Sequence, residues 1–586
     1  MLGSGRLLSR AGERFFRHIE IDAAWRDAVE EARRRGPLVY VLRNLSAVDY
    51  LALEHLTRRF DLPRIGFVNE LPPALAPQRT LRRSPTDELR ATLSADKSAV
   101  LFLKRPPGLL ESGARGRSEG TLLLEALLDM QRAHRDRHIM MMPQAFVWTM
   151  RPERRGFSLV DAVFGPADLP GDLRQVVQLL LNYKHGMLRA GEALSLAEFL
   201  EQQGEGDDEA LIHRLTYALL RKVERERRTI VGPARKPPDR VVEEVLRSPK
   251  LQETIRELAG PGFAERALLT DKARDMLREM QTIPDPETQG SLELLAERVL
   301  DRVYSGLDVD LEGLESLRKL RADGSVVLLP SHKSHVDYIV LSFILRQHNI
   351  QIPVIAAGDN LSFFPAGPLL RRCGAFFIRR SFRGDRLYTA VVDAYVRRLL
   401  RDGFMIEVFL EGGRSRTGKL LPPMLGLLNM VVASALGLES RKVYFQPVSI
   451  GYERLMEEGA FARELSGEQK QKEDAAQLLK LPRVLSDRWG RINIQFGEPI
   501  ELGALRRALG NHDDDPSPAK RRAVVKRLAH RAMHEINRVT AVTPGALIAM
   551  VLLSHARRGV PYRDLLAHCR RLSATLSRLG ARQTPS

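Results

Sequence analysis

The chain has 586 residues, which is too long for one hydrophobic core and predicts two or three domains. Its 44% hydrophobic and 28% charged residues exclude a largely disordered protein. Lys and Arg number 91 against 73 Asp and Glu. The resulting net charge of +18 favours an anionic partner: nucleic acid, an acidic membrane surface, a phosphorylated substrate or an acidic carrier protein.

Residues 1–30 are expected to form a basic, amphipathic segment that lacks the apolar core of a signal peptide. The longest apolar stretch, Met424–Leu438, is too short to span a bilayer and contains Asn429. These features argue against a membrane span and leave association with a membrane surface open. Cys373 and Cys569, the only two cysteines, make neither a disulfide framework nor a zinc site, so we expect a reducing, cytoplasmic setting.

The sequence repeats itself. Residues 36–53 align without a gap on residues 324–341, and seven of the eighteen pairs are identical. Three further pairs of segments follow in the same order: 99–105 with 406–412, 138–146 with 442–450, and 185–196 with 491–502. The simplest interpretation is one domain present in two copies.

Each aligned segment contains a short apolar run, which predicts a buried strand, and helical segments such as residues 385–403 separate these runs. Alternating strands and helices predict an α/β fold, here two α/β domains with helices between and after them. We expect a first domain at 31–205, a helical linker region at 206–300, a second domain at 301–510 and a helical C-terminal tail at 511–586.

His332 directly follows the predicted strand VVLLP, and Asp337 comes five positions later. A strand end followed by a helix start places both side chains at one edge of the sheet. The aspartate can then orient the imidazole while the histidine removes a proton from a hydroxyl group. No GxSxG nucleophile motif is present, which favours direct attack by an activated hydroxyl over a covalent enzyme intermediate.

Two further clusters are suited to a phosphate. The segment GAFFIRR (374–380) ends in two arginines, and paired guanidinium groups can hold a phosphate bidentately. FLEGGRSRTGK (409–419) combines glycines with arginines, a serine and Lys419, although it lacks the spacing of a P-loop. Glu411 within it is suited either to hold a substrate hydroxyl or to order the arginines. Pro447 lies in a fourth, strand-like segment, YFQPVSIGYE.

In this order, the four clusters resemble the glycerol-3-phosphate acyltransferase family, specifically its large membrane-associated bacterial and mitochondrial members. The family's H-x4-D motif is matched by His332 and Asp337, its GxFFIxR motif by GAFFIRR, its FxEGxRSR motif by FLEGGRSR, and its fourth motif by the segment containing Pro447. The resemblance is strongest over residues 320–500. The longer bacterial members carry a C-terminal extension, whereas this sequence ends about 80 residues after its last repeated segment.

The resemblance implies transfer of an acyl group from acyl-CoA or acyl carrier protein to the sn-1 hydroxyl of glycerol 3-phosphate, with no metal or other cofactor. His332 and Asp337 would be catalytic. The substrate-binding residues implied are Arg380, Glu411, Gly412, Arg414, Ser415 and Lys419, and Pro447 would form a wall of the acyl site. The protein would lie on the cytoplasmic face of the bacterial inner membrane, as a peripheral protein on an anionic surface.

The first copy lacks the residues on which this chemistry depends. Asn44 stands where the second copy has His332, and Lys104 stands where it has Glu411. An asparagine cannot act as a base, so we interpret residues 31–205 as a degenerate, non-catalytic copy.

Three alternatives to this function remain. The acceptor could be dihydroxyacetone phosphate, because it also offers a phosphate and a primary hydroxyl. The protein could be a catalytically silent, lipid-binding scaffold, although the intact His332/Asp337 pair argues against this. Nucleic-acid binding is suggested by charge alone and matches no recognised motif, so we expect no nucleic-acid partner.

Overall fold

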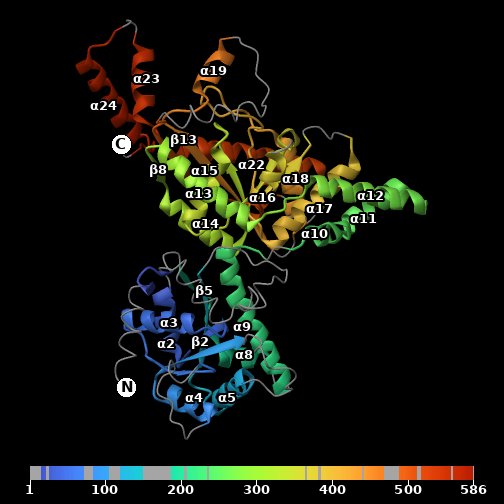
Figure 1. Cartoon of the computed structure of the whole chain (residues 1–586), viewed down its shortest axis with the longest axis vertical. Coiled ribbons are helices and arrows are strands. Elements are labelled where there is room, and N and C mark those ends of the chain that lie inside the picture. The colour runs from blue at the N-terminus through green and yellow to red at the C-terminus, as the bar shows by residue number, and fades with distance from the viewer. Residues whose placement is uncertain are drawn as a thin grey trace. The chain divides into compact units, whose positions relative to one another are not determined.

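The computed structural model of the chain describes residues 15–21, 25–71, 84–104, 119–148, 186–203, 207–233, 236–362, 366–379, 384–438, 441–466, 488–510, 517–555 and 559–584. These residues form two compact units, unit 1 (Met1–Arg235) and unit 2 (Lys236–Ser586). Figure 1 shows that each unit is a sheet flanked by helices. The expected α/β architecture with two domains is therefore confirmed.

Unit 1 contains a mixed sheet in the order β1-β6-β5-β2-β4-β3, with β7 pairing with β5. Its strands are β1 (Glu20–Ile21), β2 (Leu38–Asn44), β3 (Ile65–Val68), β4 (Ser98–Lys104), β5 (Met140–Val147), β6 (Met187–Ala190) and β7 (Leu194–Ser195). Its described helices are α2 (Trp25–Arg35), α3 (Ala47–Arg59), α4 (Pro85–Ser94), α5 (Glu119–Ala133), α8 (Leu196–Gln203) and α9 (Asp208–Val231).

Unit 2 contains a second mixed sheet in the order β11-β10-β12-β9-β13-β14-β8, with β15 pairing with β13. Its strands are β8 (Gly306–Val309), β9 (Gly324–Pro330), β10 (Val354–Gly358), β11 (Ala375–Ile378), β12 (Ile406–Glu407), β13 (Lys442–Tyr452), β14 (Arg491–Phe496) and β15 (Ile500–Glu501). Its helices before β13 are α10 (Pro238–Leu246), α11 (Pro249–Ala259), α12 (Phe263–Met280), α13 (Pro286–Val303), α14 (Leu311–Asp323), α15 (Asp337–Gln347), the 3-10 helix η2 (Asp359–Leu361), α16 (Ala366–Cys373), α17 (Arg386–Asp402) and α18 (Leu425–Leu436). Those after β13 are α19 (Glu458–Leu465), α21 (Leu502–Ala508), α22 (Pro518–Val539), α23 (Pro544–Ser554) and α24 (Tyr562–Arg578).

The two sheets have the same topology, which confirms the repeat that the sequence predicts. Read from β3, unit 1 has the order β3-β4-β2-β5-β6-β1, and unit 2 has the order β10-β12-β9-β13-β14-β8 beyond its extra strand β11. Each pair of neighbouring strands in unit 1 has the same orientation, parallel or antiparallel, as the corresponding pair in unit 2. The residues of corresponding strands also pair in the same register. Val41 pairs with Pro143 as Leu329 pairs with Pro447, and Gln144 pairs with Ala190 as Val448 pairs with Phe496.

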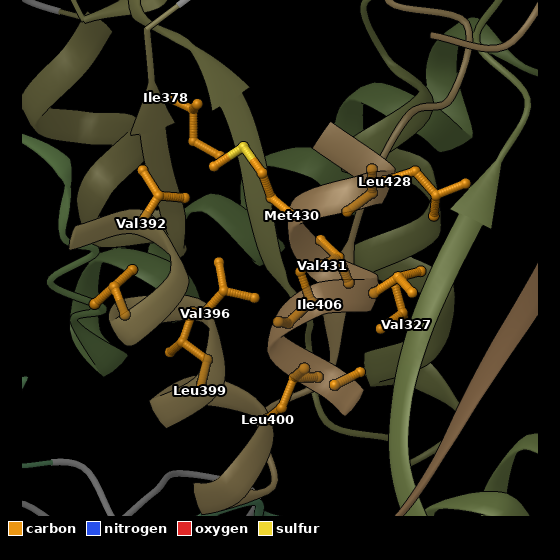
Figure 2. Packing of buried hydrophobic residues seen from close by; sticks show 14 of the residues in the cluster. Val327, Ile378, Val392, Val396, Leu399, Leu400, Ile406, Leu428, Met430 and Val431 are labelled. Atoms are coloured by element: carbon orange, nitrogen blue, oxygen red, sulfur yellow. The ribbon is translucent and has the colours of Figure 1, made fainter. Parts of the chain in front are cut away.

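Each sheet is buried on both faces, because successive residues of its central strands enter different hydrophobic clusters. In β9, Val327 and Leu329 pack with α17, α18 and α22, whereas Val326 and Leu328 pack with α13, α14 and α15. This arrangement explains the unbroken apolar run VVLLP, since a strand covered on both sides has no polar face. Figure 2 shows part of the first cluster, in which α17 and α18 pack on the strands through Val392, Val396, Met430 and Val431.

The unit boundary lies inside the region expected to be a linker, residues 206–300. The described residues there are largely helical, but the helices belong to the two cores. Leu215 and Leu219 of α9 are buried in unit 1, and Leu251 and Leu277 of α11 and α12 are buried in unit 2. The expected C-terminal tail is divided in a similar way, because α22 buries an apolar face in the core of unit 2 through residues such as Leu528.

A close backbone approach ties β9 to β13 at Gly324. A Cβ atom there would lie 2.5 Å from the carbonyl oxygen of Lys442, and one at the equivalent Gly36 would lie 1.9 Å from that of His138. We expect Gly324→Ala to lower the stability of unit 2 by about 1–3 kcal/mol, because the strands must separate to admit the methyl group. Hydrogen exchange of β9 and β13 amides during urea titration measures this loss.

Gly290→Ala is the control for that experiment. Gly290 lies inside α13 with open space around it, so alanine is expected to be neutral or stabilising by up to about 1 kcal/mol. Equal exchange protection in Gly324→Ala and in the wild type would contradict the close approach.

Candidate active site

The side chains of His332 and Asp337 meet at the edge of the sheet where β9 ends. Nδ1 of His332 lies 3.0 Å from Oδ2 of Asp337. The His332 side chain is 19% exposed and Asp337 is fully buried. The imidazole also contacts the ring of Phe409, with 4.3 Å between ring centroids. Because Nδ1 faces the carboxylate, Nε2 is the nitrogen left to take a proton from a substrate.

Four donors surround the buried Asp337 carboxylate. Besides His332, the backbone N–H groups of Lys333 and Ser334 donate to Oδ2 at 2.7 and 2.9 Å. The hydroxyl of Tyr452, at the end of β13, donates to Oδ1 at 2.5 Å. Burial, followed by the proximity of Asp337, raises the pKa of Tyr452 well above its ordinary value, so the phenol keeps its proton and remains a donor. These bonds hold the aspartate in the orientation that the histidine requires.

Glu411 joins the turn that carries His332 to the loop that follows β12. Its Oε1 accepts from the backbone N–H of His332 and its Oε2 accepts from that of Leu421, both at 2.8 Å. Burial raises the pKa of Glu411, and the two backbone hydrogen bonds oppose that shift. Both carboxylate oxygens are therefore engaged in fixing the two loops. This ordering of the two loops is a role that the sequence did not suggest for Glu411, and its contact with a substrate hydroxyl or with the arginines stays a prediction.

Ser415 and Gly412 also shape this loop. The backbone N–H of Ser415 donates to the carbonyl oxygen of His332 at 2.9 Å, and its buried hydroxyl donates to the carbonyl oxygen of Lys419 at 2.5 Å. Gly412 has a φ of +63°, and a Cβ there would lie 2.1 Å from Sδ of Met424. Both residues thus stabilise the loop, and their contact with substrate stays a prediction.

The predicted phosphate-binding cations differ in how far they are buried and in whether the structure describes them. Arg414 is 10% exposed, and its Nη1 lies 3.7 Å from Oε1 of Glu457, whereas Lys419 is exposed. Arg380 lies outside the described residues. Its neighbour Arg379 is paired with Glu279 at 2.7 Å. The structure therefore brings Arg414 next to the His332 turn, and the roles predicted for Lys419 and Arg380 stay predictions.

Pro447 occupies the position where β13 changes its antiparallel partner. Tyr444 and Phe445 pair with β15, whereas Val448 and the residues after it pair with β14. Proline has no N–H group to donate, which suits a position between two partners. Its carbonyl oxygen accepts from the N–H of Gly497 at 2.9 Å, as that of Pro143 accepts from Gly191 at 2.8 Å. Unit 1 shares this arrangement without a histidine at the position of His332, which indicates a structural role. Contact with the acyl chain stays a prediction.

Comparison with known proteins agrees with this geometry. Residues 14–232 match the family described as glycerol-3-phosphate acyltransferase PlsB N-terminal domain, residues 308–451 match the acyltransferase family, and residues 461–586 match the glycerol-3-phosphate acyltransferase C-terminal region. The chain is 33% identical over 544 residues to the glycerol-3-phosphate acyltransferase of Shewanella frigidimarina (strain NCIMB 400), and 32% identical over 543 residues to that of Shewanella amazonensis (strain ATCC BAA-1098 / SB2B). The chain belongs to the glycerol-3-phosphate acyltransferase family. Each alignment covers 90% of this chain but 63% of the relative, so the chain spans somewhat less than two thirds of their length.

The regions that match these families follow the architecture of the chain. The acyltransferase match at 308–451 contains His332, Glu411, Arg414 and Pro447, and the N-terminal match covers most of unit 1. The match to the C-terminal region, residues 461–586, includes the last repeated segment and the helices α21 to α24. Within the part of the chain that the structure describes, no helix is both long and apolar enough to cross a membrane.

Unit 1 keeps the aspartate of the acyltransferase site without its base. Asp49 is partly buried, and Nε1 of Trp148 donates to its Oδ1 at 2.6 Å. Trp148 occupies the position of Tyr452 in the aligned strands, so an aromatic donor is present in both copies. Burial raises the pKa of Asp49 to about 7, and the hydrogen bonds from Trp148 and Ser46 oppose that shift. Asn44 stands where unit 2 has His332.

Sequence reasoning missed three residues of the site. Tyr452 and Glu457 come from the strand and turn more than 100 positions after His332, and no spacing rule connects them to it. The repeat did contain a signal for Tyr452, because its counterpart Trp148 is also an aromatic donor. The third residue is Lys333, whose buried ammonium has a pKa lowered by desolvation, an effect that the charges of Asp337 and Glu411 oppose.

Glu407 of β12 is a fully buried acid beneath this site. It pairs along the sheet with Leu328 and Ile355. Among the described residues, neither of its oxygens has a hydrogen-bond partner. Burial, and then the charge of Asp337, raises its pKa well above the ordinary value. The aligned residue of unit 1 is Val100, so the same sheet position accepts an apolar side chain.

We expect Glu407→Leu to stabilise unit 2 by about 1–3 kcal/mol, because it removes an unpartnered carboxyl from the core. The gain should grow as the pH rises above about 4.3, the ordinary glutamate pKa. Above that pH the unfolded wild type releases a proton that the folded form retains, so the wild type loses stability. Thermal unfolding between pH 4 and pH 8 measures the difference. Glu407→Gln, which removes the titratable group but keeps a buried polar group, is the control. It should show the same growth of the gain with pH, and an equal gain of both variants at pH 4 would contradict the explanation.

Proposed function

We propose that the protein transfers an acyl group from acyl-CoA or acyl carrier protein to the sn-1 hydroxyl of glycerol 3-phosphate, giving 1-acylglycerol 3-phosphate. The observation that carries this proposal is the His332/Asp337 pair, in which a buried carboxylate holds Nδ1 of a partly exposed imidazole. Membership of the glycerol-3-phosphate acyltransferase family, and the name that the relatives share, support the choice of acceptor.

In the proposed reaction, Nε2 of His332 removes the proton of the acceptor hydroxyl as its oxygen attacks the thioester carbonyl carbon. Asp337 stabilises the imidazolium that forms. The carbon–sulfur bond then breaks and the thiolate leaves, which needs no strong acid because thiolates are stable anions. The proton on His332 returns to the thiolate or to solvent. This sequence of steps requires no metal or other cofactor.

Arg414, with Lys419 and Arg380, is proposed to hold the acceptor phosphate. Arg414 is the best supported of the three, because it lies beside the His332 turn and its guanidinium suits a phosphate oxygen pair. The positive net charge of +18 would also favour an anionic donor, since both acyl-CoA and acyl carrier protein are anionic. Nucleic acid is not among the proposed partners.

The C-terminal helical pair is proposed to contact an anionic membrane surface. Helix α23 exposes Ile548, Met550, Leu552 and Leu553. The adjoining α24 exposes Arg563, Arg570, Arg571 and Arg578, for none of which an ion pair is found among the described residues. An apolar face beside a row of cations suits acyl chains below anionic headgroups. A peripheral location on the cytoplasmic face of the bacterial inner membrane would follow.

His332→Ala is expected to lower the rate of acyl transfer by at least about 100-fold, because the general base is removed. The measurement is release of free thiol from acyl-CoA or acyl carrier protein, with glycerol 3-phosphate and dihydroxyacetone phosphate compared as acceptors. Asn44→Ala, the same change at the equivalent position of unit 1, is the control and is expected to leave the rate unchanged. Full activity of His332→Ala would refute the assignment of the base, and a strong preference for the ketone would refute the acceptor.

Replacing Leu552 and Leu553 by glutamate should weaken binding to phosphatidylglycerol vesicles by at least about tenfold, because two apolar anchors are lost and negative charge is added. Co-sedimentation with these vesicles and with phosphatidylcholine vesicles measures binding. Leu311→Glu, at another exposed leucine of unit 2, is the control. Equal binding of the double variant and the wild type would show that α23 is not the membrane contact.

A further inference from the structure

Glu457 lies in the turn between β13 and α19 and holds the turn that carries His332. Both of its carboxylate oxygens lie 2.9 Å from the hydroxyl of Ser334, which donates to them. Its Oε1 also accepts from the backbone N–H of His335 at 2.9 Å. The Glu457 side chain is 16% exposed, so these bonds are largely shielded from water. Ser334 and His335 lie between His332 and Asp337, and Glu457 therefore fixes the middle of the H-x4-D turn.

The carboxylate of Glu457 also faces Arg414, in the loop after β12 that is proposed to bind the acceptor phosphate. Nη1 of Arg414 lies 3.7 Å from Oε1 of Glu457. The helix that follows Glu457 continues this contact, because the guanidinium of Arg414 lies 5.7 Å from the ring centroid of Phe461 in α19. The ion pair and the ring contact thus hold the guanidinium of Arg414 in place beside the His332 turn.

Glu457 therefore connects the turn of His332, the proposed base, to Arg414, the proposed phosphate-binding residue, through a single carboxylate. His332 belongs to the turn after β9, whereas Arg414 belongs to the loop after β12, and these loops are separate in sequence. Glycerol 3-phosphate has a primary and a secondary hydroxyl, which differ by one carbon in their distance from the phosphate. A fixed spacing between Arg414 and His332 presents one of these hydroxyls to Nε2 in preference to the other.

We propose that Glu457 is a positioning residue that determines which hydroxyl of the acceptor is acylated, by fixing Arg414 relative to His332. This inference rests on the proposed function and extends it from the substrate to the regiochemistry of the reaction. Glu457 does not touch the reacting atoms. Its removal should therefore reduce the alignment of the acceptor more than its binding.

The test is Glu457→Gln in the full chain, assayed with glycerol 3-phosphate and palmitoyl-CoA. We expect kcat to fall by about 10- to 100-fold, since small misplacements of reacting groups have effects of this size. KM for glycerol 3-phosphate should change by less than about threefold, because loss of a negative charge beside Arg414 does not weaken its attraction for phosphate. The fraction of 2-acyl product, measured after a rapid acidic quench that slows acyl migration, should rise.

Two further variants keep the test decisive. Glu458→Gln changes the adjacent residue, which is exposed and paired with Arg454, and should leave kcat and the isomer ratio unchanged. Ser334→Ala removes a partner of Glu457 without touching Arg414, and should raise the 2-acyl fraction even if Glu457→Gln folds poorly. If the wild type acylates glycerol 3-phosphate but both site variants keep its kcat and isomer ratio, the role of Glu457 is refuted and the proposed function stands. An inactive, folded wild type would instead refute the proposed function.

Discussion

The buried carboxylate of Asp337 is the group on which the arrangement of the site depends. A carboxylate removed from water is stable only when hydrogen bonds replace its hydration, and Asp337 receives bonds from an imidazole, two backbone N–H groups and a phenol. The hydrogen bonds to Asp337 in turn hold each of these donors in one position. The backbone donors define the turn after β9, the phenol brings in the end of β13, and the imidazole acquires the orientation that a base requires.

A second layer of carboxylates connects this turn to the loop after β12. Glu411 binds backbone N–H groups on both sides, and Glu457 binds the turn and approaches Arg414. The acids near His332 thus act mainly as acceptors that order the loops. This role explains why Glu411, a prominent residue of its motif, points into the protein.

The sequence predicted the repeat, the principal buried strands, and the meeting of His332 with Asp337. Those predictions rest on short-range patterns: apolar runs for buried strands, and five positions between two side chains at a strand end. Tyr452 and Glu457 could not be predicted in this way, because pairing of β13 beside β9 brings them to the site. Helical character alone also does not show which core buries α9 or α22.

The hydrogen bond between Asp49 and Trp148 has a consequence for the classification of related sequences. Unit 1 retains an aspartate, an aromatic donor and the surrounding sheet register, yet it has Asn44 in the position of the base. The aspartate and its aromatic donor therefore occur together at a position that no histidine accompanies. A search that relies on the aspartate and its strand would count two active sites in this chain, whereas one that requires the histidine together with Glu411 would count one.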